Sequence, residues 1–443
     1  MDDYFEQHKP TYSIAHYLSV GSKARDVKTL GFELEHFVVR KGSLAPVPYR
    51  VENGSSEPSV QHILEHLNDY YPEATYEDSG NGSPYLFGLN REKVAVSLEP
   101  GAQLEVSIGP AVSVKEIDTH YQQFRSEVDP ILDSMGLQLL ARGYHPTALA
   151  RDIQLLPKHR YEYMDDYFTH TGKHGICMMR ATASTQVSID FASEADALAK
   201  FRIANALGPF FAFLTDNSPV FEAERIGALG GTVEQAASGL AVPWSMARMV
   251  CWDDTDPERS LIAKGGFDED FSFLRYAADL MEAPAIFLPG PDASSKPVYL
   301  GFTSFEQALP NDFIDEAMVL HILSLFFFDA RFKNYLEIRQ ADSLPREYAM
   351  AYAALISGIF YNPEALRYYA DCFASTDSTA IALAKSALRE HGYAAEVYGR
   401  PATDWLDGLL EHALGGLSAE DAPYLTPLLE LVAKRASLLE LLP

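Results

Sequence analysis

Four short segments that lie far apart in the chain share one pattern, and this pattern limits the fold more than any other feature of the sequence. In each segment apolar and polar side chains alternate, as they do in a β-strand with one apolar and one polar face. The apolar positions suit a hydrophobic core, so the segments predict a sheet that buries one face. The segments are GFELEHF at residues 31–37, AQLEVS at 102–107, TQVSIDF at 185–191 and YLEIRQ at 335–340.

The polar faces of these segments have an unusual composition. Glutamate is a poor strand former, yet it recurs at Glu33, Glu35, Glu105 and Glu337, and Glu99 lies in a turn just before the second segment. The solvated face of an antiparallel sheet would give the same alternation, and for any single segment this is the favoured explanation. The recurrence of glutamate favours a functional face instead. The other polar residues on these faces are Gln103, Gln186, Ser188, Asp190 and Arg339.

If these segments are neighbouring strands, their carboxylates converge. Two such charges about 4 Å apart repel each other by roughly 4 kcal/mol at an effective dielectric constant of about 20. A cluster of this kind persists only if cations neutralise it, and an all-oxygen donor set suits Mg²⁺ or Mn²⁺ better than Zn²⁺. Magnesium held by carboxylates usually completes its coordination with phosphate oxygens, which points to a nucleotide.

Arg339 lies two residues from Glu337 on the same predicted face. A fixed guanidinium there would pair well with a phosphate or a substrate carboxylate. It would equally well balance the charge of the neighbouring glutamate. The spacing alone does not separate the two explanations.

Composition argues against two kinds of partner. Asp and Glu total 62 against 35 Lys and Arg, a formal net charge of −27. Such a chain offers no counter-charge to nucleic acid or to an anionic membrane, so we expect neither as a partner. The three cysteines indicate reduced thiols, and the N-terminus lacks the pattern of a signal peptide. The most apolar stretch, residues 349–360, is shorter than the roughly 20 residues of a membrane span. We therefore expect a soluble, cytoplasmic protein.

The order of strand and helix signals divides the chain into two parts. Residues 1–345 mix the strands with expected helices at 113–135, 195–212 and 315–328. Helical patterns alone follow in residues 346–443. The predicted fold class is α+β, with a catalytic part at 1–345 and a helical C-terminal region packed on it.

At these residues the sequence resembles the glutamate–cysteine ligases, in particular the clade of plant and proteobacterial enzymes. The resemblance runs from about residue 31 to about residue 361. Any one motif is weak evidence, but seven motifs in the family's order and at similar spacing are specific. The motifs are GFELEHF, SLEPGAQLEVS, RYEYM, MM followed by TASTQVSIDF, a helix that ends in NSP, WDDTDPER and YLEIRQAD.

The resemblance implies a fold like the catalytic domain of glutamine synthetase, with a curved antiparallel sheet, flanked by helices, whose concave face binds Mg²⁺, ATP and glutamate. It implies an ATP-dependent ligase that joins the γ-carboxylate of glutamate to the amine of cysteine through a γ-glutamyl phosphate, in the first step of glutathione-type thiol synthesis. We expect a monomer or a small homo-oligomer. By match of motif, the metal ligands would be Glu33, Glu35, Glu99, Glu105, Gln186 and Glu337.

The same resemblance implies roles for further residues. Arg339 would contact the transferring phosphoryl group and, with Glu337, form the catalytic pair. Arg339 and Lys333 would bind the nucleotide. The residues assigned to the amino-acid substrates are Arg160, Arg180, Thr185, Arg248 and Trp252.

Two departures from the family pattern bear on the amine substrate. The loop between Asn217 and Trp252 is longer here than in plant relatives, which makes the register of Arg248 uncertain. Arg180 stands one position earlier in MMRATAST than the arginine does in relatives with MMLRT. A γ-glutamyl ligase for another amino acid or amine therefore stays open beside cysteine. A non-catalytic nucleotide-binding homologue is the third alternative.

Overall fold

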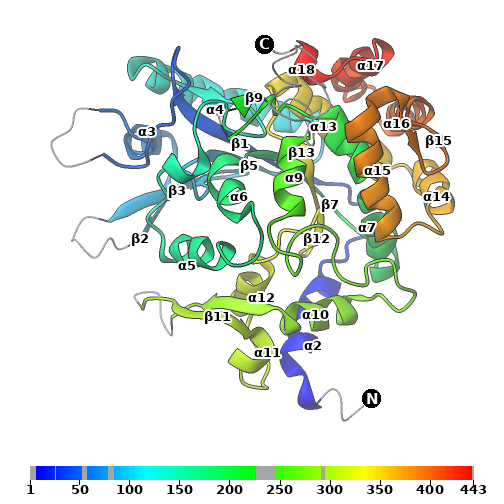
Figure 1. Ribbon diagram of the computed structural model, residues 1–443, viewed down its shortest axis with the longest axis horizontal. Helices are drawn as coiled ribbons and strands as arrows, with labels where there is room; N and C mark the ends of the chain where they lie inside the picture. Colours follow the sequence, from blue (N-terminus) through cyan, green and yellow to red (C-terminus); the bar gives the residue numbers. More distant parts are fainter. Residues whose placement is uncertain are drawn as a thin grey trace.

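A nine-stranded antiparallel sheet forms the centre of the computed structural model, which describes residues 6–24, 26–51, 57–77, 84–222, 224–225, 246–290 and 295–441. The strand order is β12-β13-β7-β1-β5-β4-β3-β2, and β6 pairs with the far end of β1. With helices on both sides of the sheet (Figure 1), the α+β class predicted from the sequence is confirmed. The strands are β1 (Leu30–Arg40), β2 (Glu73–Glu77), β3 (Tyr85–Arg91), β4 (Val94–Leu98), β5 (Leu104–Ala111), β6 (Leu137–Leu140), β7 (Ser184–Ile189), β12 (Ala330–Phe332) and β13 (Leu336–Asp342).

The register of the central strands aligns the polar positions predicted from the alternation. In the β1–β5 pair Glu35 lies opposite Glu105, and in the β1–β7 pair Glu33 lies opposite Gln186. Glu337 of β13 lies opposite Ser188 of β7. Because directly opposed residues project from the same face, the four segments present one shared polar face.

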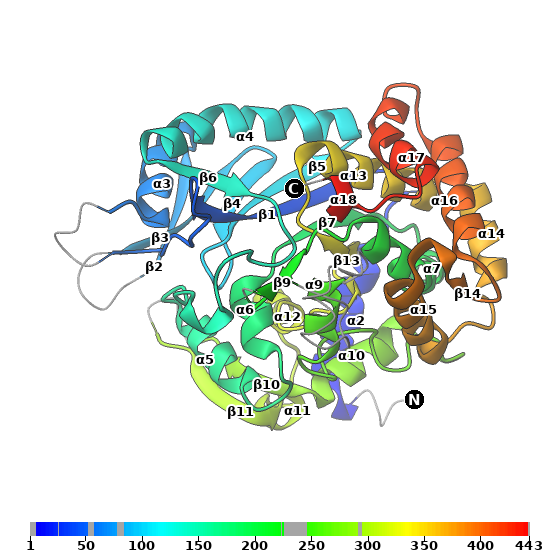
Figure 2. The ribbon, with the colours of Figure 1, turned by 45° about the horizontal axis from the view of Figure 1, so that its top comes forward.

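Helices α3 (Val60–Leu67), α4 (Val114–Ser134) and α13 (Arg346–Phe360) cover the apolar face of the sheet. Figure 2 shows α4 lying across the strands. The helix starts where the sequence predicts, because the side chain of Ser113 accepts a hydrogen bond from the backbone N–H of Glu116. On β1 the buried His36 projects to this side, and its Nε2 lies 2.9 Å from the hydroxyl of Tyr121 in α4.

A second set of helices lies against the polar face. These are α5 (His159–Phe168), α6 (Gly175–Ala181) and α9 (Ala247–Asp253). A smaller layer lies beyond them and contains the hairpin of β10 (Pro284–Leu288) and β11 (Val298–Ser304). Its helices are α2 (Lys9–Val20), α10 (Phe273–Glu282), α11 (Phe305–Ala308) and α12 (Glu316–Leu323).

The C-terminal helices gather on one side of the molecule, coloured orange to red in Figure 1. They are α14 (Pro363–Cys372), α15 (Ser378–His391), α16 (Ala402–Gly416), α17 (Thr426–Ala433) and α18 (Leu438–Leu441). The region also contains a short ladder of β14 (Glu396–Val397) and β15 (Arg400–Pro401), so the expectation of helices alone was wrong. One hydrophobic cluster contains side chains from this region and from the sheet. The division at residues 345 and 346 stays our interpretation.

Helix α7 (Glu194–Leu214) connects the two parts and contacts α14, α15 and β13. By length and composition alone this helix is able to cross a membrane, a property that the sequence analysis missed. However, 83% of its most apolar window is buried inside the protein, as in the core helix of a soluble protein.

The helix expected at residues 315–328 is shorter in the structure, because α12 ends at Leu323. The backbone N–H groups of Phe327 and Asp329 donate instead to the carbonyls of Arg259 and Leu261, at 2.7 and 2.6 Å. These long-range bonds replace the helical ones and extend the chain toward β12.

Candidate active site

A cavity of about 270 Å³ lies between the polar face of the sheet and helices α5, α6 and α9. Strands β1, β5, β7, β12 and β13 and these helices contribute its walls, so segments that are far apart in the sequence meet there. Glu337, Arg180 and Thr185 are the predicted site residues that do not line it. The predicted residues that do are Glu33, Glu35, Glu99, Glu105, Arg160, Gln186, Arg248, Trp252, Lys333 and Arg339.

Three carboxylates in this cavity form a compact cluster. One oxygen each from Glu35, Glu99 and Glu105 lie within 4.8 Å of one another. The convergence expected from the sequence is therefore present in the fold. Glu35 comes from β1, Glu105 from β5, and Glu99 from the turn between β4 and β5.

Hydroxyl and amide donors orient two of these carboxylates. Glu35 accepts from the N–H and Oγ of Ser184, at 2.7 and 2.8 Å. Gln186 Nε2 donates to Glu35 at 2.9 Å. Glu105 accepts from Ser97 Oγ at 2.8 Å and from Ser107 Oγ at 3.0 Å.

The turn that carries Glu99 is tightly held. The Glu99 N–H donates to the carbonyl of Gln103 at 3.0 Å, and the side-chain oxygen of Gln103 accepts from the Gly101 N–H at 2.8 Å. Gly101 passes so close to α6 that a Cβ there would collide with the carbonyl oxygen of Arg180. The turn expected at Glu99 from the sequence is thus present, and it joins β4 to β5.

Burial and mutual repulsion raise the pKa values of these acids. Burial is the largest cause for Glu35, Glu99 and Glu105, and the charge of Glu35 raises the pKa of the other two further. For Glu33, burial and then the charges of Glu105 and Glu337 raise the pKa to about 7. A divalent cation would relieve this cost, and carboxylate oxygens are its preferred donors. The donor set therefore fits Mg²⁺ or Mn²⁺.

Glu337 lies behind the cavity wall with no exposed area, surrounded by cations. Its carboxylate pairs with Arg331 at 2.5 Å, with Arg339 at 2.9 Å and with Lys333 at 3.1 Å. Burial alone would raise its pKa, but the charges of Arg331, Lys333 and Arg339 outweigh burial and hold the pKa below its ordinary value. In this arrangement Glu337 orients the cations, and its predicted role as a metal ligand stays a prediction.

Arg339 has partners that fit both explanations offered by the sequence. Its Nη1 donates to Glu337 and to the side-chain oxygen of Gln186. Its side chain also lines the cavity. The guanidinium is therefore positioned by protein carboxylate and amide groups while it faces the space open to a substrate. Because the Gln186 oxygen accepts from Arg339, the predicted metal ligation by Gln186 also stays a prediction.

Several buried donors at the cavity have no hydrogen-bond partner among the described residues. They are Nε of Arg160, Nε of Arg248 and the indole N–H of Trp252. Arg248 lies 5.8 Å from the Trp252 ring, and Arg339 lies 6.0 Å from the same ring. Buried donors are normally paired, so these N–H groups are well suited to donate hydrogen bonds to a substrate carboxylate.

Arg180 and Thr185 were expected to contact the substrate, but the structure places both side chains outside the cavity. Arg180 forms a two-pronged ion pair with Asp165, at 2.9 and 2.6 Å, which joins α6 to α5. Thr185 is fully buried, and its hydroxyl donates to the carbonyl of Asp342 at 2.9 Å. Successive residues of a strand project to opposite faces. Since Ser184 and Gln186 project to the polar face, the side chain of Thr185 between them projects away from the cavity.

Sequence reasoning missed Arg331, which lines the cavity from β12. Its signal was weak, because β12 is only three residues long and its alternation, ARF, is too short to recognise. Phe327 also lines the cavity, as do Met164, Met178 and Met179. Within the long loop between Asn217 and Trp252, residues 223 and 226–245 lie outside the described residues.

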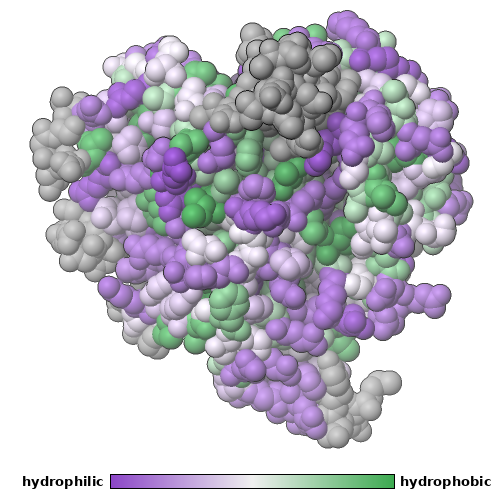
Figure 3. All heavy atoms as spheres, in the orientation of Figure 1, coloured by the Kyte–Doolittle hydropathy of each residue, from purple (hydrophilic) through white to green (hydrophobic). Residues whose placement is uncertain are grey.

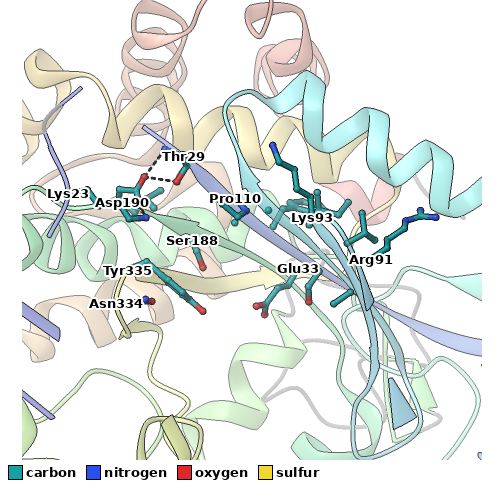
Figure 4. A pocket seen from close by; sticks show the side chains of 18 residues that line it. Lys23, Thr29, Glu33, Arg91, Lys93, Pro110, Ser188, Asp190, Asn334 and Tyr335 are labelled. Atoms are coloured by element: carbon teal, nitrogen blue, oxygen red, sulfur yellow. Dashed lines mark hydrogen bonds and ion pairs between the residues drawn. The ribbon is translucent and has the colours of Figure 1, made fainter. Parts of the chain in front are cut away.

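A larger cavity of about 470 Å³ adjoins the first, and Glu33 lines both. Figure 4 shows its walls, with Glu33 of β1, Ser188 of β7 and Tyr335 beside β13. At one end Asp190 pairs with Lys23 and accepts from the N–H and hydroxyl of Thr29, both at 2.7 Å. Because Glu33 borders both cavities, the two lie next to each other on the polar face.

An antiparallel sheet with a carboxylate cluster on its polar face and arginines on the facing helices is the architecture of a carboxylate–amine ligase. The family model described as glutamate-cysteine ligase family 2 matches residues 29–433. The chain belongs to this family of ligases.

Relatives and a solved structure agree with this assignment. The chain is 28% identical over 400 residues to a chloroplastic glutamate–cysteine ligase of Nicotiana tabacum, covering 89% of this chain and 70% of that protein. It is 29% identical over 405 residues to the chloroplastic enzyme of Arabidopsis thaliana, with the same coverage of 89% and 70%. A crystal structure of glutamate–cysteine ligase from Francisella tularensis, in complex with AMP, has the same fold. Its TM-score is 0.50 at 13% identity, over 93% of this chain and 82% of that chain.

The cytoplasmic location expected from the sequence was wrong. The curated relatives from Nicotiana tabacum, Arabidopsis thaliana, Solanum lycopersicum and Medicago truncatula are all named as chloroplastic enzymes. The expectation rested partly on three unpaired cysteines. Unpaired thiols report a reducing environment and do not identify the compartment.

Proposed function

We propose that this protein joins the γ-carboxylate of glutamate to the amine of cysteine, with ATP as the source of energy. The observation that carries the proposal is the group of Glu35, Glu99 and Glu105, whose oxygens lie within 4.8 Å of one another in a cavity that also presents unpaired arginine donors. Acidic residues alone would repel the anionic substrates. Cations held by the acidic residues, together with the arginines, make the same cavity attractive to them.

The reaction needs two bond exchanges. The γ-carboxylate oxygen of glutamate attacks the γ-phosphorus of ATP, and the bond from that phosphorus to ADP breaks. The amine nitrogen then attacks the acyl carbon, the amide bond forms, and phosphate leaves with the electron pair. The amine gives up a proton during this second step, to a carboxylate of the cavity or to an oxygen of the leaving phosphate. The protein contributes mainly positioning and charge neutralisation.

The residues divide these tasks by position. Glu35, Glu99 and Glu105 would hold Mg²⁺ or Mn²⁺, with Glu33 on the side of the larger cavity. When bound, these ions would neutralise phosphate and carboxylate charge during phosphoryl transfer. Arg339 would donate to the phosphoryl group in flight, since Glu337 fixes its guanidinium at the cavity wall.

The larger cavity is the proposed place for the nucleotide. Its volume of about 470 Å³ is suited to a base and ribose, and Glu33 at its border marks where the phosphates would enter the smaller cavity. Lys333, 3.1 Å from Glu337, would then lie near the phosphates. Arg160 and Arg248 would hold the carboxylates of the amino-acid substrates.

The direct test is phosphate release from ATP with glutamate and Mg²⁺, with and without cysteine, together with mass spectrometry of the product. We expect cysteine-dependent release and a γ-glutamylcysteine product. If neither Mg²⁺ nor Mn²⁺ supports that product, the proposal fails.

A ligase for a different amine is the second candidate. Met164, Met178 and Met179 line the cavity, and methionine side chains adapt to apolar groups of different shape. Such a wall accepts a cysteine thiol as well as a larger apolar side chain. A panel of amino acids in the same assay decides between them, since a clear preference for cysteine in kcat/KM removes this candidate.

A further inference from the structure

One lysine of the helical C-terminal region reaches the catalytic part behind α9. Lys385 lies on α15, and its Nζ is 3.0 Å from Asp253 Oδ1 and 3.0 Å from Asp329 Oδ2. The side chains of Lys385 and Asp329 are 12% and 8% exposed, and that of Asp253 is 38% exposed. A single, largely buried ammonium thus joins three elements that are distant in the sequence.

Asp253 connects this ammonium to the cavity through α9. It is the last residue of that helix and directly follows Trp252. Arg248 and Trp252 are one helical turn apart, so they project from the same face of α9 into the cavity. Any displacement of the end of α9 would therefore move both side chains.

Asp329 connects the same ammonium to Arg339. The backbone N–H of Arg339 donates to the carbonyl of Asp329 at 3.0 Å. The pairing of β13 with β7 shifts register between Ile338 and Ala341. At this irregular point the bond to Asp329 holds the backbone of Arg339.

The described side chains of α9 and α15 do not fill the space between the two helices. A cavity of about 360 Å³ lies between the two helices, lined by residues such as Met249 and Val250 of α9 and Ile381 of α15. Burial alone would lower the pKa of Lys385, but the charges of Asp329 and Asp253 outweigh burial and hold it above its ordinary value. The lysine is therefore charged throughout the neutral range.

We propose that Lys385 is a positioning residue for the ligase reaction. By pairing with Asp253 and Asp329 it sets the distance between α9 and the strand of Arg339, and hence the arrangement of Arg248, Trp252 and Arg339 around the substrates. This inference rests on the proposed function. It also gives the helical C-terminal region a part in the active site beyond packing.

The test separates positioning from charge balance with three variants. Lys385→Met leaves two carboxylates facing each other without a cation. The triple variant Lys385→Met, Asp253→Asn, Asp329→Asn removes the charges as well as the link. Lys385→Arg keeps a cation that is able to bridge both carboxylates. The matched control is Lys434→Met, which removes an exposed lysine paired with Glu430 on α17.

We expect Lys385→Met to lower kcat/KM at least tenfold and to lower the Tm. The triple variant should recover the wild-type Tm but not the wild-type kcat/KM. Lys385→Arg should recover most of both quantities. The control Lys434→Met should match the wild type in both. If the triple variant recovers wild-type kcat/KM, or if Lys385→Met leaves kcat/KM unchanged, the inference is overturned.

Amide hydrogen exchange distinguishes failure of this inference from failure of the proposed function. In Lys385→Met, exchange in peptides that cover α9 and residues 329–342 should rise above the wild-type rate, whether or not the protein turns over ATP. A wild type without ligase activity would refute the proposed function, whereas unchanged exchange in the variant would refute the link through Lys385.

Discussion

Glu33 and Glu337 show how identical side chains acquire opposite electrostatics on one sheet face. Burial and neighbouring glutamates raise the pKa of Glu33 to about 7. Glu337 is more deeply buried and has no exposed area, yet Arg331, Lys333 and Arg339 hold its pKa below its ordinary value. Glu337 is therefore a permanent anion that orients cations. At Glu33 the nearby cations do not offset burial and the repulsion from other glutamates. A bound metal ion would supply the missing positive charge.

Replacing one carboxylate of the cluster tests the metal site at this scale. Glu99→Gln keeps the shape of the side chain but removes a charged donor, so we expect the Mg²⁺ concentration needed for half-maximal activity to rise. The rise should be at least on the order of tenfold, a loss that even residues orienting a metal ligand produce. Phosphate release measured against Mg²⁺ concentration checks this. Glu430→Gln, on the exposed face of α17, is the control, and an unchanged Mg²⁺ curve for Glu99→Gln would contradict the assignment.

Arg248 allows a test of substrate binding that preserves charge. Arg248→Lys replaces a planar, two-pronged donor with a point charge, so a substrate carboxylate would lose one of its hydrogen bonds. We expect KM for one amino-acid substrate to rise by roughly tenfold, equivalent to about 1.4 kcal/mol, with a smaller effect on kcat. Steady-state kinetics with each substrate varied in turn give the answer. Arg202→Lys is the control, since Arg202 bonds the carbonyls of Gly266 and Asp268 away from the cavity.

At the scale of elements, short helices close the cavity and depend on specific side-chain links. Helix α6 has seven residues and α9 has seven, too few to be stable by themselves. The ion pair of Arg180 with Asp165 joins α6 to α5. A residue expected to bind substrate therefore acts, in the structure, as a connection between two walls of the cavity.

This placement of Arg180 predicts an effect on stability rather than on substrate binding. Arg180→Met should lower the free energy of unfolding by about 1–3 kcal/mol, the cost of leaving a buried polar partner unpaired. KM for the amino-acid substrates should change less than twofold. Thermal unfolding and kinetics on the same preparation measure both quantities. A large rise in KM without loss of Tm would restore the role expected from the sequence.

At the scale of the whole molecule, an acidic chain gathers buried carboxylates together with arginines and a lysine in one cavity. The net charge of the chain is −27, and on the face drawn in Figure 3 small groups of hydrophobic residues alternate with hydrophilic ones. Surface charges are screened by salt and solvent. The buried carboxylates are not, so they dominate the response of stability to pH and to divalent cations.

The cavity predicts a pH-dependent stability that divalent cations suppress. Glu33 has an ordinary pKa of 4.5 and a folded-state pKa of about 7. Its protonated form therefore favours the folded state below the ordinary value, and this contribution is lost as the pH rises through about 7. In EDTA the Tm should fall between pH 5.5 and pH 8 by more than it does in excess Mg²⁺.

The variant Glu33→Gln serves as the matched comparison for this prediction. Because it has no carboxylate to titrate, its Tm in EDTA should depend less on pH than that of the wild type. Differential scanning fluorimetry at both pH values, with EDTA or Mg²⁺, supplies the comparison. Equal slopes for wild type and variant would show that Glu33 does not titrate as the structure indicates.

The alternation of Glu33, Glu35 and Glu105 with apolar neighbours predicted from the sequence that these glutamates lie on a polar strand face. This was possible because the side to which a strand residue projects is a local property of the backbone. For the same reason the start of α4 at Ser113 and the α+β class were predictable. The family motifs added the expected chemistry of the polar face.

Only the tertiary structure decided which of these residues meet. Strand register set Glu35 opposite Glu105. Long-range pairing supplied Arg331 to Glu337 and the ammonium of Lys385 to α9. Such contacts join segments far apart in the chain, and their energies depend on burial and on neighbouring charges that no local pattern of residues contains.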